Sequence, residues 1–316
     1  MSAHPSVSVL MTAFNRERYI GAAIESVLAQ TFADLELIIV DDCSTDDTVN
    51  VARSYLGDSR VRLVQNERNL GDYPNRNHAA TFATGRYLKY HDSDDLMYPH
   101  CLSVMVGALE AEPSAAFALS GHRSWPGGPS PMLLTPRLAY QREFFGEGLF
   151  NFGPAAALFR RDIFASLSGF PEQGSHSDTL FWLSACARLN VLLVYGDLYW
   201  YRMHPGQELR GVNAAYEGAS LEWRWRAALE SPDCPLPPDE RERARRNAVG
   251  RILRSVSRDI RGGRLRLAWF RIRHTRMSWR QWLRYASRPR VSIEAGTPMT
   301  ADGEPIVADA LRIRRP

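Results

Sequence analysis

Apolar and polar positions follow two periods along the chain, and these divide its first 120 residues into strand-like runs and helical segments. Short β-rich runs predict strands, and apolar residues that recur every three or four positions predict amphipathic helices. The predicted strands lie at residues 7–12, 35–40, 61–64, 86–90 and 115–119. The predicted helices lie at residues 19–28, 74–84 and 100–110, and a Ser-Thr-Asp-Asp box at residues 44–47 predicts a fourth helix start. This order predicts an α/β fold with a mostly parallel central sheet flanked by helices.

The pattern changes twice after residue 120. Residues 121–136 are rich in glycine and proline and predict a loop. Further strands are predicted at residues 155–159 and 191–195, with helices at 162–167 and 179–189. The alternation then fades and gives way to a helical pattern, most regular at residues 239–260. We therefore divide the chain into an α/β domain (1–210), a helical basic region (211–290) and a tail expected to be mobile (291–316).

The composition is that of a globular protein, because 45% of the 316 residues are hydrophobic and 23% are charged. No apolar run approaches the roughly 18 residues that a membrane-spanning helix needs, and no signal-peptide pattern opens the chain. The four cysteines form no metal-binding or disulfide pattern, so a reducing, cytoplasmic location is expected. The net charge is only +4, but residues 261–293 hold ten arginines and no acidic residue.

Three carboxylates, Asp92, Asp94 and Asp95, stand where a predicted strand meets a loop. Ligands in such sheets bind at the carboxyl ends of the strands. Closely spaced carboxylates repel one another unless a cation lies among them, and Mg²⁺ or Mn²⁺ accepts one or two carboxylates together with water and phosphate oxygens. The motif therefore predicts a site for a metal-bound diphosphate. The alternative is a solvated acidic turn that caps the next helix.

Several other polar motifs follow predicted strands or helices in a fixed order. They are Phe14-Asn15, Gln30-Thr31, Asp41-Asp42 with Ser44 and Asp46, Asn69 with Gly71, Arg76-Asn77 and Trp200-Tyr201-Arg202-Met203-His204. In order and spacing, together with the aspartates, they resemble the family 2 inverting glycosyltransferases of the GT-A fold. The resemblance covers about residues 6–205 and implies a bacterial glycan-assembly enzyme.

The resemblance also implies roles for individual residues. Those matched to nucleotide or donor binding are Thr12, Ala13, Phe14, Asn15, Asp41, Arg68, Asn77, Asp92, Ser93 and Asp95. Asp94 and His204 match the positions that hold the cofactor, Mn²⁺ or Mg²⁺. UDP is favoured as the nucleotide because Asp41 matches the family's uracil contact. The alternatives are a helix cap for Asp41, a solvated arginine for Arg68 and a turn histidine for His204.

An inverting transfer also needs a base for the acceptor hydroxyl. In the family this base stands at a helix start after a Gly-Phe turn. Here Gly169-Phe170 precedes Asp178, which is the matching catalytic residue. The family often has a second acid beside it, where this chain has Ser177, and Asp178 is alternatively a plain helix cap.

The resemblance implies transfer of a single sugar from a nucleoside-diphosphate sugar to a glycan or lipid-linked acceptor. The Gln-x-x-Arg-Trp motif of processive synthases is incomplete, because Gly211 follows Gln207 and Arg210. Two other classes stay open, a sugar-phosphate nucleotidyltransferase and a non-catalytic carbohydrate-binding protein. The first usually carries a glycine-rich loop with a following lysine near its start, which is missing here. The intact aspartates and histidine argue against the second.

The arginine-rich segment contains Trp269, Trp279 and Trp282 at roughly helical spacing. An apolar stripe among cations is typical of a helix that lies on an anionic membrane surface. The alternative is that the stripe packs on the α/β domain or on a second copy in a homo-oligomer, with the arginines solvated. No nucleic-acid partner is expected. The sequence predicts either a peripheral contact with the inner face of the cell membrane or a packing element.

Overall fold

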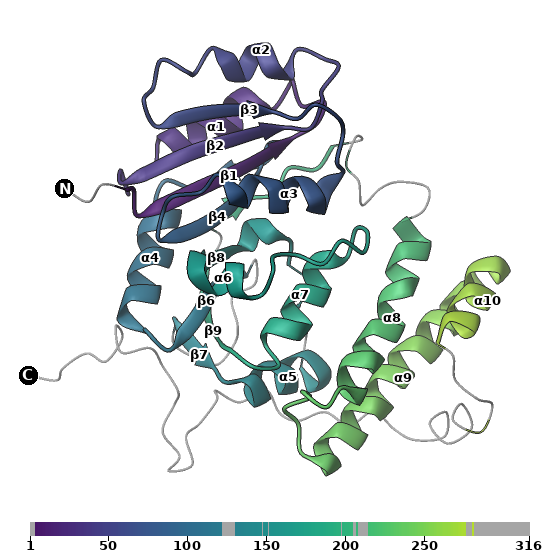
Figure 1. Ribbon diagram of the computed structural model, residues 1–316. Helices are drawn as coiled ribbons and strands as arrows, with labels where there is room; N and C mark the ends of the chain where they lie inside the picture. The colour runs from purple at the N-terminus through teal and green to yellow at the C-terminus, as the bar shows by residue number, and fades with distance from the viewer. Residues whose placement is uncertain are drawn as a thin grey trace, which may run out of the picture.

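A computed structural model describes residues 4–121, 130–146, 148–150, 152–196, 198–204, 207, 214–275 and 280 (Figure 1). An eight-stranded sheet runs through the molecule in the order β3-β2-β1-β4-β8-β6-β9-β7. Its strands are β1 (Val7–Ala13), β2 (Leu35–Asp41), β3 (Val61–Gln65), β4 (Tyr87–Asp92), β6 (Ala115–Gly121), β7 (Met132–Leu134), β8 (Ala157–Arg160) and β9 (Asn190–Tyr195). A small second sheet pairs β5 (Leu96–Met97) with β10 (Tyr199–Trp200) in antiparallel fashion.

The central sheet is mostly parallel, as the sequence predicts. β1 pairs in parallel with both β2 and β4, β2 with β3, and β6 with β9. Only β8 and β7 run against their neighbours. The carboxyl ends of β1, β2 and β4 therefore meet at one edge, where ligands of open α/β sheets bind.

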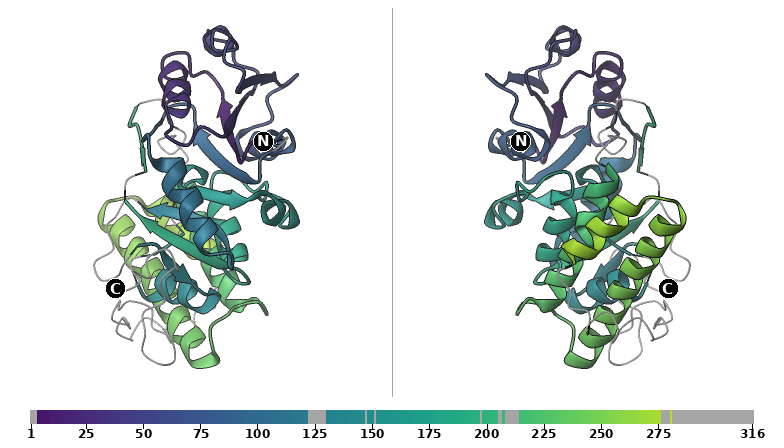
Figure 2. Two further views of the ribbon diagram at one scale, coloured as in Figure 1. Left: turned by 90° about the vertical axis from the view of Figure 1, so that its left-hand side faces the viewer. Right: turned by 90° about the vertical axis from the view of Figure 1, so that its right-hand side faces the viewer.

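Helices cover both faces of the sheet (Figures 1 and 2). On the chain's first half these are α1 (Ile20–Leu28), α2 (Thr48–Arg53), α3 (Asp72–Thr81) and α4 (Cys101–Ala111). The second half adds α5 (Pro136–Phe145), α6 (Arg161–Ser166), α7 (Ser177–Ala185) and the 3₁₀ turn η1 (Pro154–Ala156). Successive residues of β1 point to opposite faces, so Val9 packs with α1 and α4, whereas Leu10 packs in a second core with α3 and α7.

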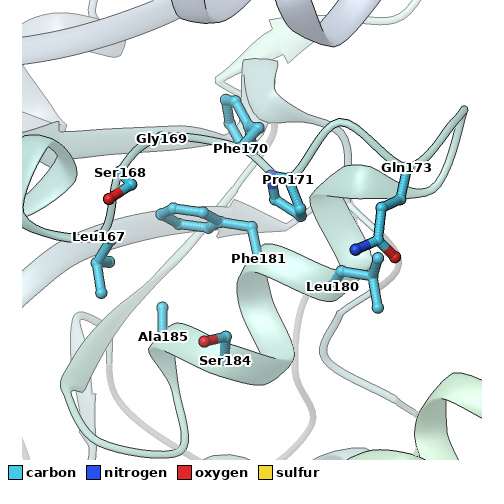
Figure 3. Close-up of a pocket in the computed structure, with 10 residues that line it drawn as sticks. All are labelled: Leu167, Ser168, Gly169, Phe170, Pro171, Gln173, Leu180, Phe181, Ser184 and Ala185. Atoms are coloured by element: carbon cyan, nitrogen blue, oxygen red, sulfur yellow. The ribbon is translucent and has the colours of Figure 1, made fainter.

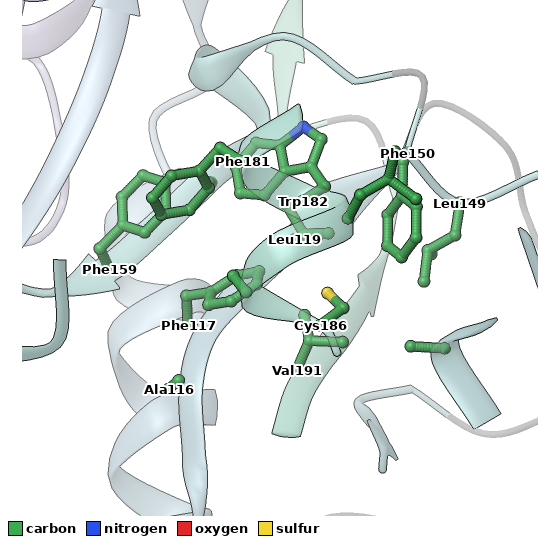
Figure 4. Close-up of a cluster of buried hydrophobic side chains, with 14 of the residues drawn as sticks. Ala116, Phe117, Leu119, Leu149, Phe150, Phe159, Phe181, Trp182, Cys186 and Val191 are labelled. Carbon is green, nitrogen blue, oxygen red and sulfur yellow. The ribbon is translucent and has the colours of Figure 1, made fainter. Parts of the chain in front are cut away.

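The second core is built around aromatic rings (Figure 4). Phe159 of β8 stacks on Trp182 of α7 with ring centroids 5.7 Å apart, and Phe117 and Phe181 close around this pair. Buried aromatic side chains remove large apolar areas from water, each stabilising the fold by roughly 1.5–3 kcal/mol. The cluster fixes α7, and with it the position of Asp178 at the helix start.

Two predictions about the elements need correction. The helix predicted from the Ser-Thr-Asp-Asp box at residues 44–47 is present, but α2 begins only after the box, at Thr48, whose N–H and hydroxyl both donate to the Asp46 carboxylate. The predicted loop at residues 121–136 contains β7, which pairs with β9, and it ends where the unpredicted helix α5 begins. Residues 122–129 of that loop lie outside the described residues.

The predicted helical region contains α8 (Ala214–Glu230), α9 (Pro238–Arg261) and α10 (Leu265–His274). Leu229 and Leu236, together with Ala244 and Ala248 of α9, belong to the same hydrophobic cluster as the α7 aromatic rings. The helical region thus shares a core with the α/β domain, and the division near residue 210 stays a prediction. The tail at residues 291–316 lies outside the described part of the chain. None of the described helices combines the length and apolar content that a membrane span requires.

Candidate active site

The predicted site residues gather where β1, β2 and β4 end. Thr12 is the register partner of Asp92 on β4, and Ala13 is the register partner of Asp41 on β2. Phe14 follows directly and is 44% exposed, which is unusual for a phenylalanine beside a buried strand. The sheet register alone therefore brings Asp41 and Asp92 to either side of the end of β1.

Hydrogen bonds fix the loops that follow β1 and β2. Asn15 adopts a left-handed backbone (φ 53°), and its side-chain oxygen accepts the N–H of Thr45 at 2.8 Å. Asp41 accepts the N–H of Ser44 through Oδ2, whereas its buried Oδ1 has no partner among the described residues. A buried, unpaired carboxylate oxygen costs free energy unless a ligand or water donates to it. Asp41 Oδ1 is thus suited to accept a hydrogen bond from a ligand.

Asp42 beside it has a different task. Its carboxylate accepts the N–H groups of Leu70 and Gly71 at 2.8 and 2.9 Å and the Asn66 amide at 2.8 Å. It holds the turn that precedes α3, where Gly71 has a φ of 87° that favours glycine. Asp42 is therefore saturated by the protein, and Asp41 is not.

Asp94 joins residues from three parts of the chain. Its Oδ2 lies 2.9 Å from Nε2 of His204 and accepts a hydrogen bond from Nε of Arg16 at 3.0 Å. His204 is 7% exposed and lies against the Tyr19 ring, with ring centroids 4.5 Å apart. The predicted partners Asp94 and His204 are thus in direct contact although 110 residues separate them.

The segment after β10 folds back over the aspartates. Arg202 donates its backbone N–H to Asp95 Oδ1 and its Nε to the Asp94 carbonyl, at 2.9 and 2.8 Å. Gln207 then accepts the N–H of His204 through its side chain. Burial, reinforced by the charge of Asp92, raises the pKa of Asp95 to about 8. Asp95 therefore helps to hold the 200–204 segment over the strand ends.

Arg76 of α3 connects two carboxylates of the site. Its Nη2 donates to Asp92 Oδ1 at 2.7 Å, and its Nε donates to Asp72 Oδ1 at 2.8 Å. Burial raises the pKa of Asp92, but the charge and hydrogen bond of Arg76 outweigh it, so the net shift is downward. Arg76 Nη1 is buried and finds no acceptor in the described part of the chain, so this nitrogen could donate to a ligand.

Asp178 stands at the start of α7, as predicted. Burial raises the pKa of its carboxyl to about 6, partly offset by hydrogen bonds from the Thr179 N–H and the Tyr73 hydroxyl. Tyr73 is buried and belongs to the same turn of α3 as Arg76, whose guanidinium lies 5.9 Å from the Tyr73 ring centroid. One helical turn therefore contacts both Asp178 and Asp92. A carboxyl with a pKa near 6 is ionised at pH 7 and still basic enough to accept a proton.

Asn77 supports the turn before α7. Its amide accepts the N–H of Phe170 at 2.9 Å and donates to the Phe170 carbonyl at 2.8 Å. Gly169 has a φ of 71°, and a Cβ there would lie 2.5 Å from the Asn77 side-chain oxygen. With its amide used in this way, Asn77 sets the path of the chain toward Asp178, and its predicted contact with a nucleotide stays untested.

The remaining predicted residues differ in their setting. Ser93 is buried between the aspartates, whereas Arg68 is exposed on the loop before α3. Sequence reasoning did not single out Arg16, Tyr73 or Arg202 as site residues. Arg16 and Arg202 lie within or beside quoted motifs, so a search for cations near the aspartates would have found them. No comparable signal marks Tyr73.

The donor set around Asp94 suits a hard divalent ion. Asp94 offers a carboxylate and His204 an imidazole, and Asp92 is nearby, but no group of three side chains within the described residues forms a ready metal cage. Mg²⁺ sites commonly use one or two protein ligands and take the rest from water and phosphate. Asp94 and His204 would hold the ion, which would neutralise charge on a departing diphosphate.

One hollow of the described structure lies away from these strand ends. It has a volume of about 400 Å³ and lies between the Gly169 turn and α7 (Figure 3). The residues that line it are Leu167, Ser168, Gly169, Phe170, Pro171, Gln173, Leu180, Phe181, Ser184 and Ala185. None of these carries a charge, and none was predicted to bind the nucleotide or metal. The chemistry therefore points to the strand ends and not to this hollow.

Known proteins resemble part of the chain. Its sequence is 40% identical over 112 residues to a putative glycosyltransferase, EpsE, of Bacillus subtilis, covering 35% of this chain and 40% of that protein. It is 38% identical over 103 residues to WfgD of Escherichia coli, a UDP-Glc:α-D-GlcNAc-diphosphoundecaprenol β-1,3-glucosyltransferase, covering 33% of this chain and 40% of that one. The matches thus span less than half of these two relatives.

Solved structures share the fold. The mannosyltransferase PcManGT from Pyrobaculum calidifontis, solved with GDP-Man and Mn²⁺, matches with a TM-score of 0.58 at 20% identity, covering 90% of this chain and 84% of that one. TarS of S. aureus (residues 1–349), solved with UDP-GlcNAc, matches with a TM-score of 0.57 at 20% identity over 76% of this chain and 70% of that one. At such identities the match concerns the fold, which is GT-A.

The sequence model of the family described as "Glycosyl transferase family 2" matches residues 8–167, which is about half of the chain. That stretch contains every predicted nucleotide-binding residue and Asp94, whereas Asp178 and His204 follow it. The chain belongs to glycosyl transferase family 2.

Proposed function

We propose that this protein transfers a single sugar from a nucleoside-diphosphate sugar to a hydroxyl group of a glycan or lipid-linked acceptor, with inversion at the anomeric carbon. The observation that carries this proposal is the double role of one α3 turn, whose Arg76 binds Asp92 and whose Tyr73 binds Asp178. Asp92 belongs to the donor side and Asp178 is the candidate base. Their common support fixes a base relative to a donor, which an inverting displacement requires.

The nucleoside would lie at the ends of β1 and β2. Asp41 Oδ1 is buried and unpaired, so it would accept a hydrogen bond from a base N–H. Phe14 offers an exposed ring beside it. The contact with Asp41 matches the uracil contact of the family, and we therefore expect UDP to be preferred. Asp92 would receive the ribose, and Asp94 with His204 would hold Mn²⁺ or Mg²⁺ at the diphosphate.

The transfer is a single displacement. The acceptor oxygen forms a bond to the anomeric carbon while the bond from that carbon to the diphosphate oxygen breaks, and the bonding electrons leave with the nucleoside diphosphate. Asp178 accepts the hydroxyl proton as the new bond forms. Tyr73 and Arg76 would keep Asp178 and Asp92 in place, and inversion requires that the base approach from the side opposite the leaving group.

The experiment that tests the proposal is release of nucleoside diphosphate from a panel of UDP-, GDP- and dTDP-sugars, with NMR analysis of the product's anomeric configuration. We expect turnover with at least one donor and an inverted linkage in the product. A retained configuration would contradict Asp178 as the base of a single displacement. Donor binding without any turnover on a broad acceptor panel would favour the non-catalytic carbohydrate-binding alternative.

A further inference from the structure

The outer face of α10 is apolar and is left uncovered by the described part of the chain. Leu265 is 63% exposed and Trp269 is 64% exposed, and they stand four residues apart on one face of the helix. Ile260, at the end of α9 just before the connecting turn, is 51% exposed. Large apolar side chains rarely show such exposure together on a soluble surface without a partner.

The inner face of the same helix is buried against the neighbouring helix α9. Leu267 and Ala268 are buried, and Ala268 packs with Ile252 and Val256 of α9. Figures 1 and 2 show α10 against α8 and α9 at the outer edge of the molecule, away from the sheet. The exposed residues are therefore not core positions that the fold has left open.

Cations surround this apolar face. Residues 260–275 contain five arginines and one histidine but no carboxylate. Arg264 and Arg271 donate to the buried Asp259 at 2.7 and 2.8 Å, so these two hold α10 on α9. Arg266 and Arg273, three residues before and four after Trp269, are exposed and make no ion pair within the described residues.

We propose that Ile260, Leu265 and Trp269, with Arg266 and Arg273, form a docking surface for an anionic lipid bilayer. The apolar side chains would enter the interface, where tryptophan is favoured, and the two free guanidinium groups would bind headgroup phosphates. The lack of carboxylates at residues 260–275 makes the charge of this segment complementary to an anionic membrane. This proposal for the α10 surface does not rest on the proposed catalytic activity.

The structure refines the sequence-based version of this idea. Trp279 and Trp282 lie outside the described residues, and Arg271 is bound by Asp259. The residues to test are therefore the exposed ones. Two double variants, Leu265→Gln/Trp269→Gln and Arg266→Gln/Arg273→Gln, remove the apolar and the cationic part separately. The matched control, Leu56→Gln/Arg62→Gln, removes an exposed leucine between α2 and β3 and an exposed arginine of β3. Figure 1 shows α2 and β3 far from α10.

The experiment is co-sedimentation of the full chain with phosphatidylcholine vesicles and with vesicles containing 30% phosphatidylglycerol. We expect binding to the anionic vesicles only, and weaker binding at about 0.5 M salt. Each test variant should lower the partition coefficient by roughly tenfold or more. For the arginine variant the reason is that each arginine near an anionic surface contributes about fivefold to binding. For the other variant the reason is the loss of the apolar side chains that would enter the interface. The control should bind like the wild type.

Two outcomes would overturn the proposal. In the first, the wild type does not bind anionic vesicles, or Leu265→Gln/Trp269→Gln binds as well as the wild type. In the second, that variant converts a dimer into a monomer in analytical ultracentrifugation, which makes the face a contact between copies of the chain. Circular dichroism of each variant checks the fold. Sugar-nucleotide turnover on a water-soluble acceptor is a separate measurement, so loss of membrane binding and loss of catalysis are told apart.

Discussion

The guanidinium of Arg76 and the carboxylate of Asp92 lie 2.7 Å apart at the carboxyl edge of the sheet. Arg76 also binds Asp72, and Tyr73, three residues before it, donates to Asp178. The first two turns of α3 thus organise three carboxylates that come from α3, β4 and α7. Because one helix contacts both Asp92 and Asp178, a change in α3 is expected to affect both the donor side and the base of the site.

Replacement of Asp178 by asparagine tests the base directly. The amide keeps the shape and hydrogen bonding of the side chain but cannot accept a proton. We expect kcat/KM to fall by about 10²-fold or more, while the affinity for the donor changes little. In the wild type, kcat/KM should rise with pH through about 6, because Asp178 must be ionised and burial raises its pKa to that value.

Glu172→Gln is the matched control for this experiment. Glu172 is an exposed acid on the turn just before α7, and it is the next candidate base nearby. Its replacement should leave both the rate and the pH profile unchanged. A near wild-type rate for Asp178→Asn, or a profile without the limb near pH 6, would show that the base lies elsewhere.

Tyr73→Phe removes one hydroxyl from the site. The Tyr73 hydrogen bond favours the ionised form of Asp178, so its loss should raise the Asp178 pKa and move the acid limb of kcat/KM to higher pH. The rate at pH 8 should approach the wild type, because Asp178 is ionised there in both proteins. A merely structural role for Tyr73 would lower the rate equally at all pH values. Tyr140→Phe, another buried tyrosine hydroxyl, which donates to the Leu183 carbonyl, serves as the control.

The fold was largely predictable because its strands are continuous apolar runs. β1, β2 and β4 are buried along nearly their whole length, and each was located within two residues. α5 was missed for a physical reason: it buries Arg142 and Glu143, so charged positions conceal its inner face. Glu143 is fully buried and accepts the N–H groups of Leu149 and Phe150, a tertiary contact that no period reveals.

The site was predictable only in part. Asp41 and Asp94 were found because they follow strands, and their chemistry is visible in their residue types. The pairing of Asp94 with His204 came from resemblance to a family, since no local pattern links residues 110 positions apart. Tyr73 became visible only in the structure, because its role depends on which elements the fold brings beside the carboxylates.

Arg76→Gln should destabilise the protein strongly. The substitution leaves Asp72 and Asp92 without their shared cation, and breaking a buried pair typically costs about 3–5 kcal/mol. The loss should shrink as the pH falls, because without this cation burial raises the pKa of both carboxyls in the folded variant, and a protonated carboxyl no longer needs a counter-charge. Urea unfolding at pH 7.5 and pH 4.5 measures both effects. Arg188→Gln, which removes an exposed pair with Asp233, should cost less than about 1 kcal/mol. Equal losses for the two variants would contradict a supporting role for Arg76.

Metal dependence of nucleotide binding tests the roles of Asp94 and His204. We expect UDP to bind at least about tenfold more tightly with Mn²⁺ or Mg²⁺ than with a chelator, because the ion would neutralise the diphosphate while Asp94 holds the ion. Asp94→Ala should abolish this difference. It also releases Arg16, whose Nε now donates to Asp94, and this cation is then free to bind the diphosphate without metal. The ratio of the two affinities, measured by calorimetry, is therefore a better readout than either affinity alone.

His204→Gln should reduce the ratio, and Asp162→Ala, at an exposed site on α6, should preserve it. Equal UDP affinity with and without metal in the wild type would contradict a metal role for Asp94 and His204.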